Sequence, residues 1–268
     1  MKETNDAAAR KRGRVFVRVL RDGLGITAAA VALALPATLY FAWQHAKTEP
    51  QSVPVPLRVQ HAFLGTEPAS PDVHHMADWV ADSHDNGTHW FVVIDKPNAK
   101  VFLFDRNARL QAAVPAVLGS AIGDDTYPGS GDKPLSQLKP YERTTPAGRF
   151  VAEVGETASR HEDVVWVDYD AAVSMHRIIK VPARLKAIAT PDPSDNRLSN
   201  GCINLPDAFY EKALRPAVDR NGVIVYILPE TRPITQSFAA YYDVDAPVRL
   251  AQMEESVMPR PTAIQPQH

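Results

Sequence analysis

The segment RLSNGCINLP, residues 197–206, contains the only cysteine of the 268-residue chain. A single cysteine cannot form an intrachain disulfide, so Cys202 is either an inert buried side chain or a reactive thiol. Gly201 allows a tight turn and leaves space for a ligand, and Ser199 and Asn200 are residue types that favour turns. The apolar residues that follow return the chain to a core. The segment therefore predicts a thiol on a bend that is backed by packed structure.

Outward from this segment, apolar residues occur in the short runs and two-residue alternation of β-strands. The runs at 89–94 and 101–104 flank turn residues and predict a hairpin. Further strands are expected at 149–152, 164–167, 172–179 and 223–228, and Pro115 indicates an edge or bend within 110–118. Helices are expected at 71–83, after the N-cap residue Ser70, and at 207–218. The predicted fold class is mainly β with short helices, closed into a sandwich or barrel.

The N-terminal region predicts export. Residues 23–43 carry no charge, and about 20 apolar residues suffice for a membrane-spanning helix. Basic residues precede this segment, so the positive-inside rule keeps residues 1–22 in the cytoplasm and sends the rest of the chain out. A cleaved signal peptide, ending near the alanines at 32–34, is the other interpretation. Both interpretations export the body of the protein.

The expected organisation is a cytoplasmic basic segment (1–22), a transmembrane anchor (23–43), a Pro-rich linker with a short helix (44–87), a catalytic-type domain (88–230) and a C-terminal tail (231–268). Residues 119–139 are rich in Gly, Pro, Ser and Asp and predict a long surface loop, which inside a domain is usually functional or mobile. The net charge of −2 gives no overall attraction to nucleic acid.

Export makes an unpaired thiol harder to explain without a function, because oxidising compartments favour paired cysteines or none. A cysteine nucleophile needs a proton acceptor, usually a histidine. His176 is the best candidate because it ends a predicted strand that leads toward Cys202, although it could also be a core histidine bonded to the backbone. The amides of Gly201 and Cys202 are expected to face a developing oxyanion. One cysteine among nine histidines does not form a zinc pattern.

Two further side chains near the thiol have alternative roles. Arg197 could lower the pKa of the thiol or bind a substrate carboxylate. It could equally form a surface salt bridge with Asp192 or Asp195. Asn204 could hydrogen-bond the turn or the substrate, or cap the helix that follows.

Three separated motifs resemble one family. The segment SNGCIN (199–204) is similar to the active-site signature of the L,D-transpeptidases with a YkuD-type catalytic domain. FVVIDK (91–96) and the hairpin after it resemble the opening strands of that domain. TTPAGRF (144–150) resembles its TPxGxF segment. The motifs follow in the family's order, and the resemblance covers about residues 88–230.

The resemblance implies a mainly β sandwich and an acyl transfer on peptidoglycan stem peptides, with no cofactor and no metal. Cys202 would be the nucleophile that attacks the carbonyl after the third stem residue and releases a terminal D-alanine. His176 would be the base, the Gly201 amide would contribute to the oxyanion site, and Ser199 would position the turn. Arg197 and Asn200 are expected, with Asn204, to contact the substrate. The location implied is the inner membrane, with the catalytic domain in the periplasm.

The chain also departs from the family pattern. Asn200 stands where the motif has a histidine, and Arg177 follows the base where the family commonly has a small residue. The spacer from His176 to Cys202 is longer than usual, and the extra residues fall in the loop at 191–195. Two other functions stay open for the same fold: an L,D-carboxypeptidase or other cysteine hydrolase, and a non-catalytic cell-wall binding module.

Overall fold

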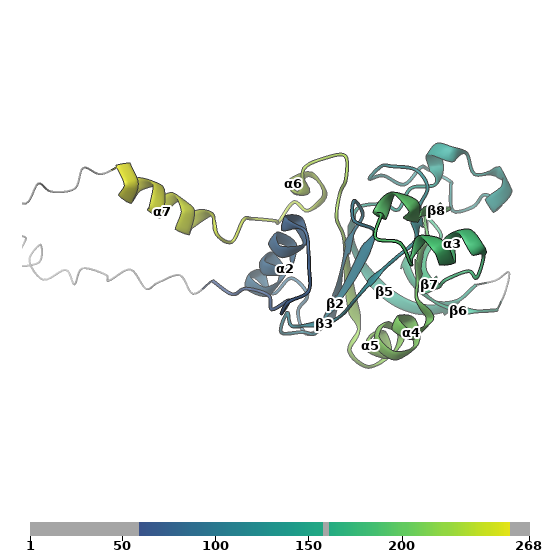
Figure 1. Ribbon diagram of the computed structural model, residues 1–268, viewed down its shortest axis with the longest axis horizontal. Coiled ribbons are helices and arrows are strands. Elements are labelled where there is room, and N and C mark those ends of the chain that lie inside the picture. The colour runs from purple at the N-terminus through teal and green to yellow at the C-terminus, as the bar shows by residue number, and fades with distance from the viewer. Residues whose placement is uncertain (1–58, 158–160, 258–268) are drawn as a thin grey trace, which may run out of the picture. The chain divides into compact units, whose positions relative to one another are not determined.

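In the described part of the chain, eight strands form one mixed sheet in the order β3-β2-β1-β10-β5-β6-β7-β9. Figure 1 shows the sheet with helix α2 (Pro71–Ser83) on one side and helices α4 (Asp207–Phe209) and α5 (Arg215–Asn221) on the other. The strands are β1 (Trp90–Asp95), β2 (Lys100–Phe104), β3 (Leu110–Pro115), β5 (Gly148–Glu156), β6 (Asp163–Asp168), β7 (Val173–Arg177), β9 (Ile203–Leu205) and β10 (Val223–Ile227). The pairs β1–β10 and β7–β9 are parallel, and the other neighbours are antiparallel. The prediction of a mainly β fold with short helices is confirmed.

The computed structural model describes residues 59–157 and 161–257. The predicted basic segment and transmembrane anchor lie outside these residues. Within the two described ranges, no helix combines the length and the apolar character that a membrane crossing requires.

The central strands are apolar throughout because both faces of the sheet are buried. Phe91 and Val93 of β1 point into one core, while Val92 and Ile94 point into the other. This alternation places successive side chains on opposite faces, as a strand geometry requires. It explains why the predicted strand at 89–94 is a continuous hydrophobic run. The predicted hairpin is confirmed, since β1 and β2 pair antiparallel.

Helix α2 (Pro71–Ser83) covers one face of the sheet. The Ser70 side chain accepts a hydrogen bond from the Val73 amide, which confirms the predicted N-cap. Met76, Trp79 and Val80 are buried against β1, β2 and β10. The same core buries Phe238, which follows the short helix α6 (Ile234–Ser237).

A second core lies on the other face of the sheet, beneath the strands next to the cysteine segment. It includes residues of β6, β7 and β9, and side chains of α4 (Asp207–Phe209) and α5 (Arg215–Asn221). The predicted helix at 207–218 therefore forms, but it contains a π-helical turn, η4 (Tyr210–Leu214). Pro216 explains the irregularity, because proline lacks the N–H that a regular helix would use at this position.

Further short elements lie in the connections. The predicted loop at 119–139 contains η1 (Leu135–Gln137) and leads into η2 (Pro140–Glu142). Between β7 and β9 the chain forms α3 (Pro182–Ala187), η3 (Pro193–Asn196) and β8 (Arg197–Ser199). Strand β8 pairs in parallel with β4 (Leu118–Gly119) as a separate two-stranded sheet. After β10 and α6, the last described helix is α7 (Ala246–Val257).

Candidate active site

The parallel pair β7–β9 brings the predicted base and the predicted nucleophile together. His176 lies directly opposite Asn204 in the register, and Met175 lies opposite Ile203. Side chains two residues apart on a strand share a face. Ser174 and His176 therefore lie on the face to which Cys202, two residues before Asn204, also belongs. The thiol is partly exposed, and the imidazole is half-buried.

The tautomer of His176 is set by the backbone. Its Nδ1 lies 2.7 Å from the carbonyl oxygen of Arg177. A carbonyl only accepts hydrogen bonds, so Nδ1 carries the hydrogen and Nε2 is the nitrogen available to the thiol. The backbone hydrogen bond of Nδ1, one of the two interpretations from the sequence, therefore leaves Nε2 free of this contact. The ring is held in an orientation that suits proton transfer.

The sulfur of Cys202 has polar neighbours with opposing effects. Burial raises the pKa of the thiol, but a hydrogen bond with His176, the positive charge of that imidazole and hydrogen bonds from Ser174 together lower the pKa below its ordinary value. The Ser174 Oγ lies 3.7 Å from Sγ. The carbonyl oxygen of Ala172 lies 3.5 Å from Sγ and accepts from the neutral thiol. The net effect favours a thiolate–imidazolium pair.

The cysteine turn is held by Ser199 and by the segment 144–150. Ser199 Oγ donates to the carbonyl of Cys202 at 2.6 Å and accepts from the Gly201 amide at 3.1 Å. Gly201 has φ of +123°, and a Cβ there would lie 2.8 Å from the Thr144 carbonyl oxygen, so only glycine fits. Thr145 Oγ1 donates to the Gly201 carbonyl at 2.8 Å. The turn is therefore fixed from two sides.

The oxyanion expectation needs correction at Gly201. Its amide donates to Ser199 Oγ and is buried, so it is already used inside the turn. The sequence predicts that the amides of Gly201 and Cys202 face an oxyanion. Because the Gly201 amide is used inside the turn, only the Cys202 amide of these two stays a candidate. Ser199 consequently has a clear place in the turn, which the sequence had suggested only by its position in the motif.

The substrate expectation for Asn204 also needs correction. Its side chain is completely buried. Nδ2 donates to the Cys202 carbonyl at 3.3 Å, and Oδ1 accepts from Arg184 at 2.8 Å. Arg184 belongs to α3 and also donates to the Leu198 carbonyl at 3.1 Å. Asn204 therefore braces the turn, which was one of the alternatives that the sequence left open.

Arg197 pairs with a residue that the sequence had not suggested. Its guanidinium forms an ion pair with Glu230 and donates to the Lys96 carbonyl at 2.9 Å. Neither Asp192 nor Asp195, the predicted partners, takes part in this pair. The Arg197 side chain is only 15% exposed, so the arginine anchors the segment before the cysteine and does not reach out to a substrate carboxylate.

This ion pair belongs to a buried cluster of charges. Lys96 is fully buried, and its Nζ lies 2.7 Å from Asp124 Oδ1 and 3.6 Å from Glu230 Oε1. The same ammonium donates to the Thr145 carbonyl at 3.0 Å. The lysine, directly after β1, thus connects with the loop after β4, with the segment after β10 and with the segment that holds the cysteine turn. Each charge has an opposite partner, as burial requires.

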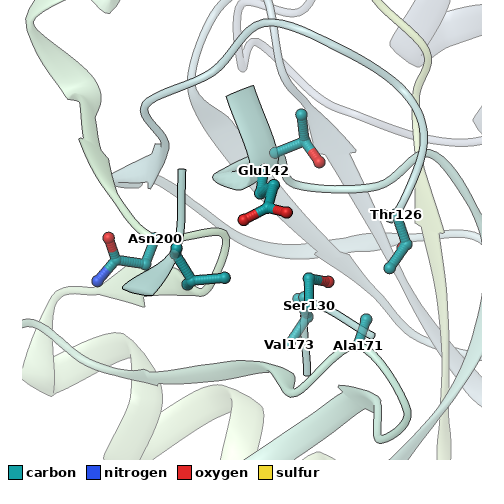
Figure 2. Close-up of a pocket in the computed structure, with 8 residues that line it drawn as sticks. Thr126, Ser130, Glu142, Ala171, Val173 and Asn200 are labelled. Carbon is teal, nitrogen blue, oxygen red and sulfur yellow. The ribbon is translucent and has the colours of Figure 1, made fainter. Parts of the chain in front are cut away.

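Asn200 lines a pocket beside the turn, together with Thr126, Ser130, Leu138, Glu142, Thr144, Ala171 and Val173. Figure 2 shows the Glu142 carboxylate between Asn200 on one side and Thr126 and Ser130 on the other. Glu142 is nearly buried, forms a 2.5 Å ion pair with Lys133 and accepts from the Lys139 amide at 2.8 Å. The hydrogen bond from Lys133 leads the interactions that hold the pKa of this carboxyl below its usual range. The pocket is polar, and Cys202, Ser174 and His176 are not among its lining residues.

Among the described residues, one group has metal-type ligands close together: His61, Asp78 and Asp245. His61 Nδ1 lies 3.2 Å from Asp78, and Nε2 lies 3.6 Å from Asp245. The two nitrogens of one ring thus face different carboxylates. The group joins α2, the segment before it and the residue before α7.

Sequence reasoning missed Ser174, Thr145 and the buried Lys96 as parts of the site. Ser174 could have been found, because it lies two residues before His176 on a predicted strand and so shares its face. Thr145 was noted only as part of a motif. Lys96 gave no signal, since lysine is usually exposed.

No protein-family model matches the chain, and no curated protein matches its sequence. Several of the solved structures that it resembles are L,D-transpeptidases. A variant of the Enterococcus faecium enzyme is 17% identical with a TM-score of 0.32, and the match covers 52% of this chain and 50% of that one. The Xylanimonas cellulosilytica L,D-transpeptidase is 13% identical with a TM-score of 0.33, over 52% of this chain and 60% of that one.

The helical cell shape determining protein Pgp2 from Campylobacter jejuni is also similar. It is 16% identical with a TM-score of 0.38, over 63% of this chain and 58% of that one. This chain therefore spans between half and three fifths of the length of the three proteins named.

Proposed function

We propose that the protein is a cysteine acyltransferase that acts on peptidoglycan stem peptides through a thioester on Cys202. The observation that carries the proposal is the shared face of β7 and β9, where the thiol meets His176 and Ser174. The substrate class comes from the resemblance of residues 199–204 and 144–150 to L,D-transpeptidase motifs. A lowered thiol pKa beside an oriented imidazole suits nucleophilic catalysis.

In this mechanism the thiol proton moves to Nε2 of His176, which forms a thiolate and an imidazolium. The thiolate attacks the carbonyl carbon after the third stem residue, and the negative charge moves to the carbonyl oxygen. The Cys202 amide donates to that oxygen. The intermediate collapses to the thioester, and the imidazolium gives its proton to the leaving amino group of D-alanine. The Arg177 carbonyl stabilises the imidazolium through Nδ1.

The second half of the reaction uses an amine of another stem as acceptor. His176 removes a proton from the attacking amine, and the thiolate leaves. If water attacks instead, the product is a tripeptide and the enzyme is an L,D-carboxypeptidase.

The test is to incubate the full-length protein with purified disaccharide-tetrapeptide muropeptides and to follow both protein and products by mass spectrometry. We expect an acyl adduct on Cys202, release of D-alanine and cross-linked dimers. Cys202→Ala should form neither adduct nor product. A folded wild-type protein that leaves the tetrapeptide intact and forms no adduct would contradict the proposal.

The outcomes also separate the two other functions. Tripeptide without cross-links identifies hydrolysis. Binding to purified sacculi that survives Cys202→Ala, in a protein that never forms an acyl adduct, identifies a non-catalytic wall-binding module.

We also propose that residues 23–43 anchor the protein in the inner membrane with the catalytic residues in the periplasm. The uncharged length and the preceding basic residues support this. Sodium carbonate extraction of membranes tests it. An anchored protein stays in the membrane pellet, whereas a cleaved one appears shortened and soluble.

A further inference from the structure

We propose that Ser174 is a second catalytic group of this site, a hydroxyl that donates to the Cys202 sulfur while it is a thiolate. The inference deepens the proposed function by dividing activation of the thiol between His176 and Ser174. Its test uses the reactivity of the thiol alone, so it can fail or succeed independently of the peptidoglycan substrate.

The geometry places Ser174 at the sulfur. Its Oγ lies 3.7 Å from Sγ, a distance at which a hydroxyl can donate to sulfur. The residue is 2% exposed, so water does not compete freely for this hydroxyl. The β7–β9 pairing holds Ser174 and Cys202 on one face, and the paired strands fix the direction of the serine side chain. His176 lies two residues further along the same strand and shares the face of Ser174.

A second group at the sulfur has the opposite effect on the protonation of the thiol. The Ala172 carbonyl accepts from the neutral thiol at 3.5 Å and so stabilises the protonated state. A thiolate at this position cannot donate to that carbonyl, and it needs donors in its place. His176, as imidazolium, supplies one donor, and the Ser174 hydroxyl and amide supply others. Ser174 therefore shifts the balance at the sulfur toward the charged form.

The other charged groups near the turn are engaged elsewhere. Glu142 of η2 pairs with Lys133, Arg184 of α3 bonds Asn204, and Arg197 pairs with Glu230. The interactions that lower the pKa of the thiol come from His176 and Ser174. Removal of the serine hydroxyl should therefore change the pKa of the thiol measurably.

A donor to the thiolate has two effects of opposite sign. It increases the fraction of thiolate at a given pH, and it makes each thiolate less nucleophilic, with a Brønsted coefficient of about 0.4–0.5. No bond is made or broken at Ser174, and its proton stays on Oγ throughout. When the sulfur bonds to carbon its charge is lost, and the hydrogen bond weakens. Ser174 thus favours reaction at low pH and slows it where the thiol is already ionised.

The experiment is a pH profile of iodoacetamide alkylation of Cys202 in the full-length protein, for the wild type and Ser174→Ala. We expect the midpoint of the profile to rise by about half to one pH unit. The rate should fall about two- to threefold well below the midpoint and rise about twofold on the alkaline plateau. Ser136→Ala, which changes an exposed serine of η1, should give the wild-type profile.

The crossing of the two profiles is the decisive result. A merely structural loss would lower alkylation or raise it at every pH, without a crossing. Coincident profiles for Ser174→Ala and wild type would overturn the inference while leaving the proposed acyl transfer in place. If Ser174→Ala unfolds, judged by circular dichroism, the same profile is measured on Ser174→Gly, which also removes the hydroxyl. A raised midpoint with crossing profiles in that variant supports the role, and a wild-type profile excludes it.

Discussion

The hydroxyl of Thr145 lies 2.8 Å from the carbonyl oxygen of Gly201, and it also accepts the Gly119 amide at 2.9 Å. One side chain thus joins the cysteine turn to β4 and to the segment before β5. Because Thr145 is fully buried, no solvent replaces these bonds.

Thr145→Val removes this hydroxyl at nearly constant volume. We expect a loss of unfolding free energy of about 2–4 kcal/mol, since two buried groups lose their partner. Without these bonds the cysteine turn should become more mobile, and this should also lower the rate of Cys202 alkylation. Urea denaturation and alkylation at pH 7 measure the two effects.

The matched control is Thr157→Val. Among the described residues, the buried Thr157 Oγ1 has no hydrogen-bond partner. The same chemical change there should alter stability by less than about 0.5 kcal/mol. Equal losses in both variants would show that the bonds of Thr145 do not matter.

His176→Ala should make the thiol less acidic, because the imidazole bonds the sulfur and supplies positive charge. The folded thiol has a lowered pKa, so its thiolate exists at a pH where an ordinary cysteine is protonated. The alkylation midpoint should therefore move to higher pH, with a rate at pH 7 lower by at least about tenfold. Turnover of muropeptides should fall about 10²–10⁴-fold. An unchanged midpoint would exclude His176 as the partner.

Lys96→Met should be strongly destabilising. Burial raises the pKa of Asp124, but hydrogen bonds from Lys96 and Thr231 outweigh burial and keep it well below its usual range. Loss of the ammonium leaves the buried carboxylates of Asp124 and Glu230 without this positive charge, which should lower the free energy of unfolding by about 3–5 kcal/mol. Lys100→Met is the control, because its pair with Glu67 is partly exposed and contributes about 1 kcal/mol or less. Chemical denaturation compares the two.

Glu142→Gln tests the pH dependence of the pocket. The pKa of Glu142 is depressed in the folded state, so its contribution to stability is complete above the unfolded pKa of about 4.3 and is lost as pH falls through the lower folded value. At pH 7 the variant should increase hydrogen exchange at the Lys139 amide, which the carboxylate accepts. In the wild type, exchange at this amide should increase only when the pH falls below the lowered pKa of Glu142. Glu67→Gln should leave that amide unchanged.

The sequence allowed the strands to be predicted, because they depend on local patterns, and alternating or continuous apolar residues marked the sheet. The lone cysteine on a Gly turn and the histidine on a strand led to the prediction that Cys202 and His176 act together, and the structure places both beside the β7–β9 pair. The Pro115 interruption was correctly interpreted, since β3 ends there at the edge of the sheet.

The remaining features depend on contacts between distant segments. Arg197 pairs with Glu230, and Lys96 with Asp124, and nothing in the local sequence distinguishes these partners from nearer carboxylates such as Asp195. The use of the Gly201 amide by Ser199 follows from the shape of the turn. That shape depends on Thr144 and Thr145, more than 50 residues earlier in the chain.

The parallel pairing of β7 with β9 has a consequence for the timing of reactivity. His176 lies on β7, and Cys202 lies directly before β9, with α3 and η3 between them, so an unfolded chain holds an ordinary, weakly acidic cysteine. Parallel pairs close long loops and form slowly. The pKa of the thiol is therefore lowered only after β9 has paired with β7 at the edge of the sheet, and during synthesis and early folding Cys202 is no more reactive than an ordinary cysteine.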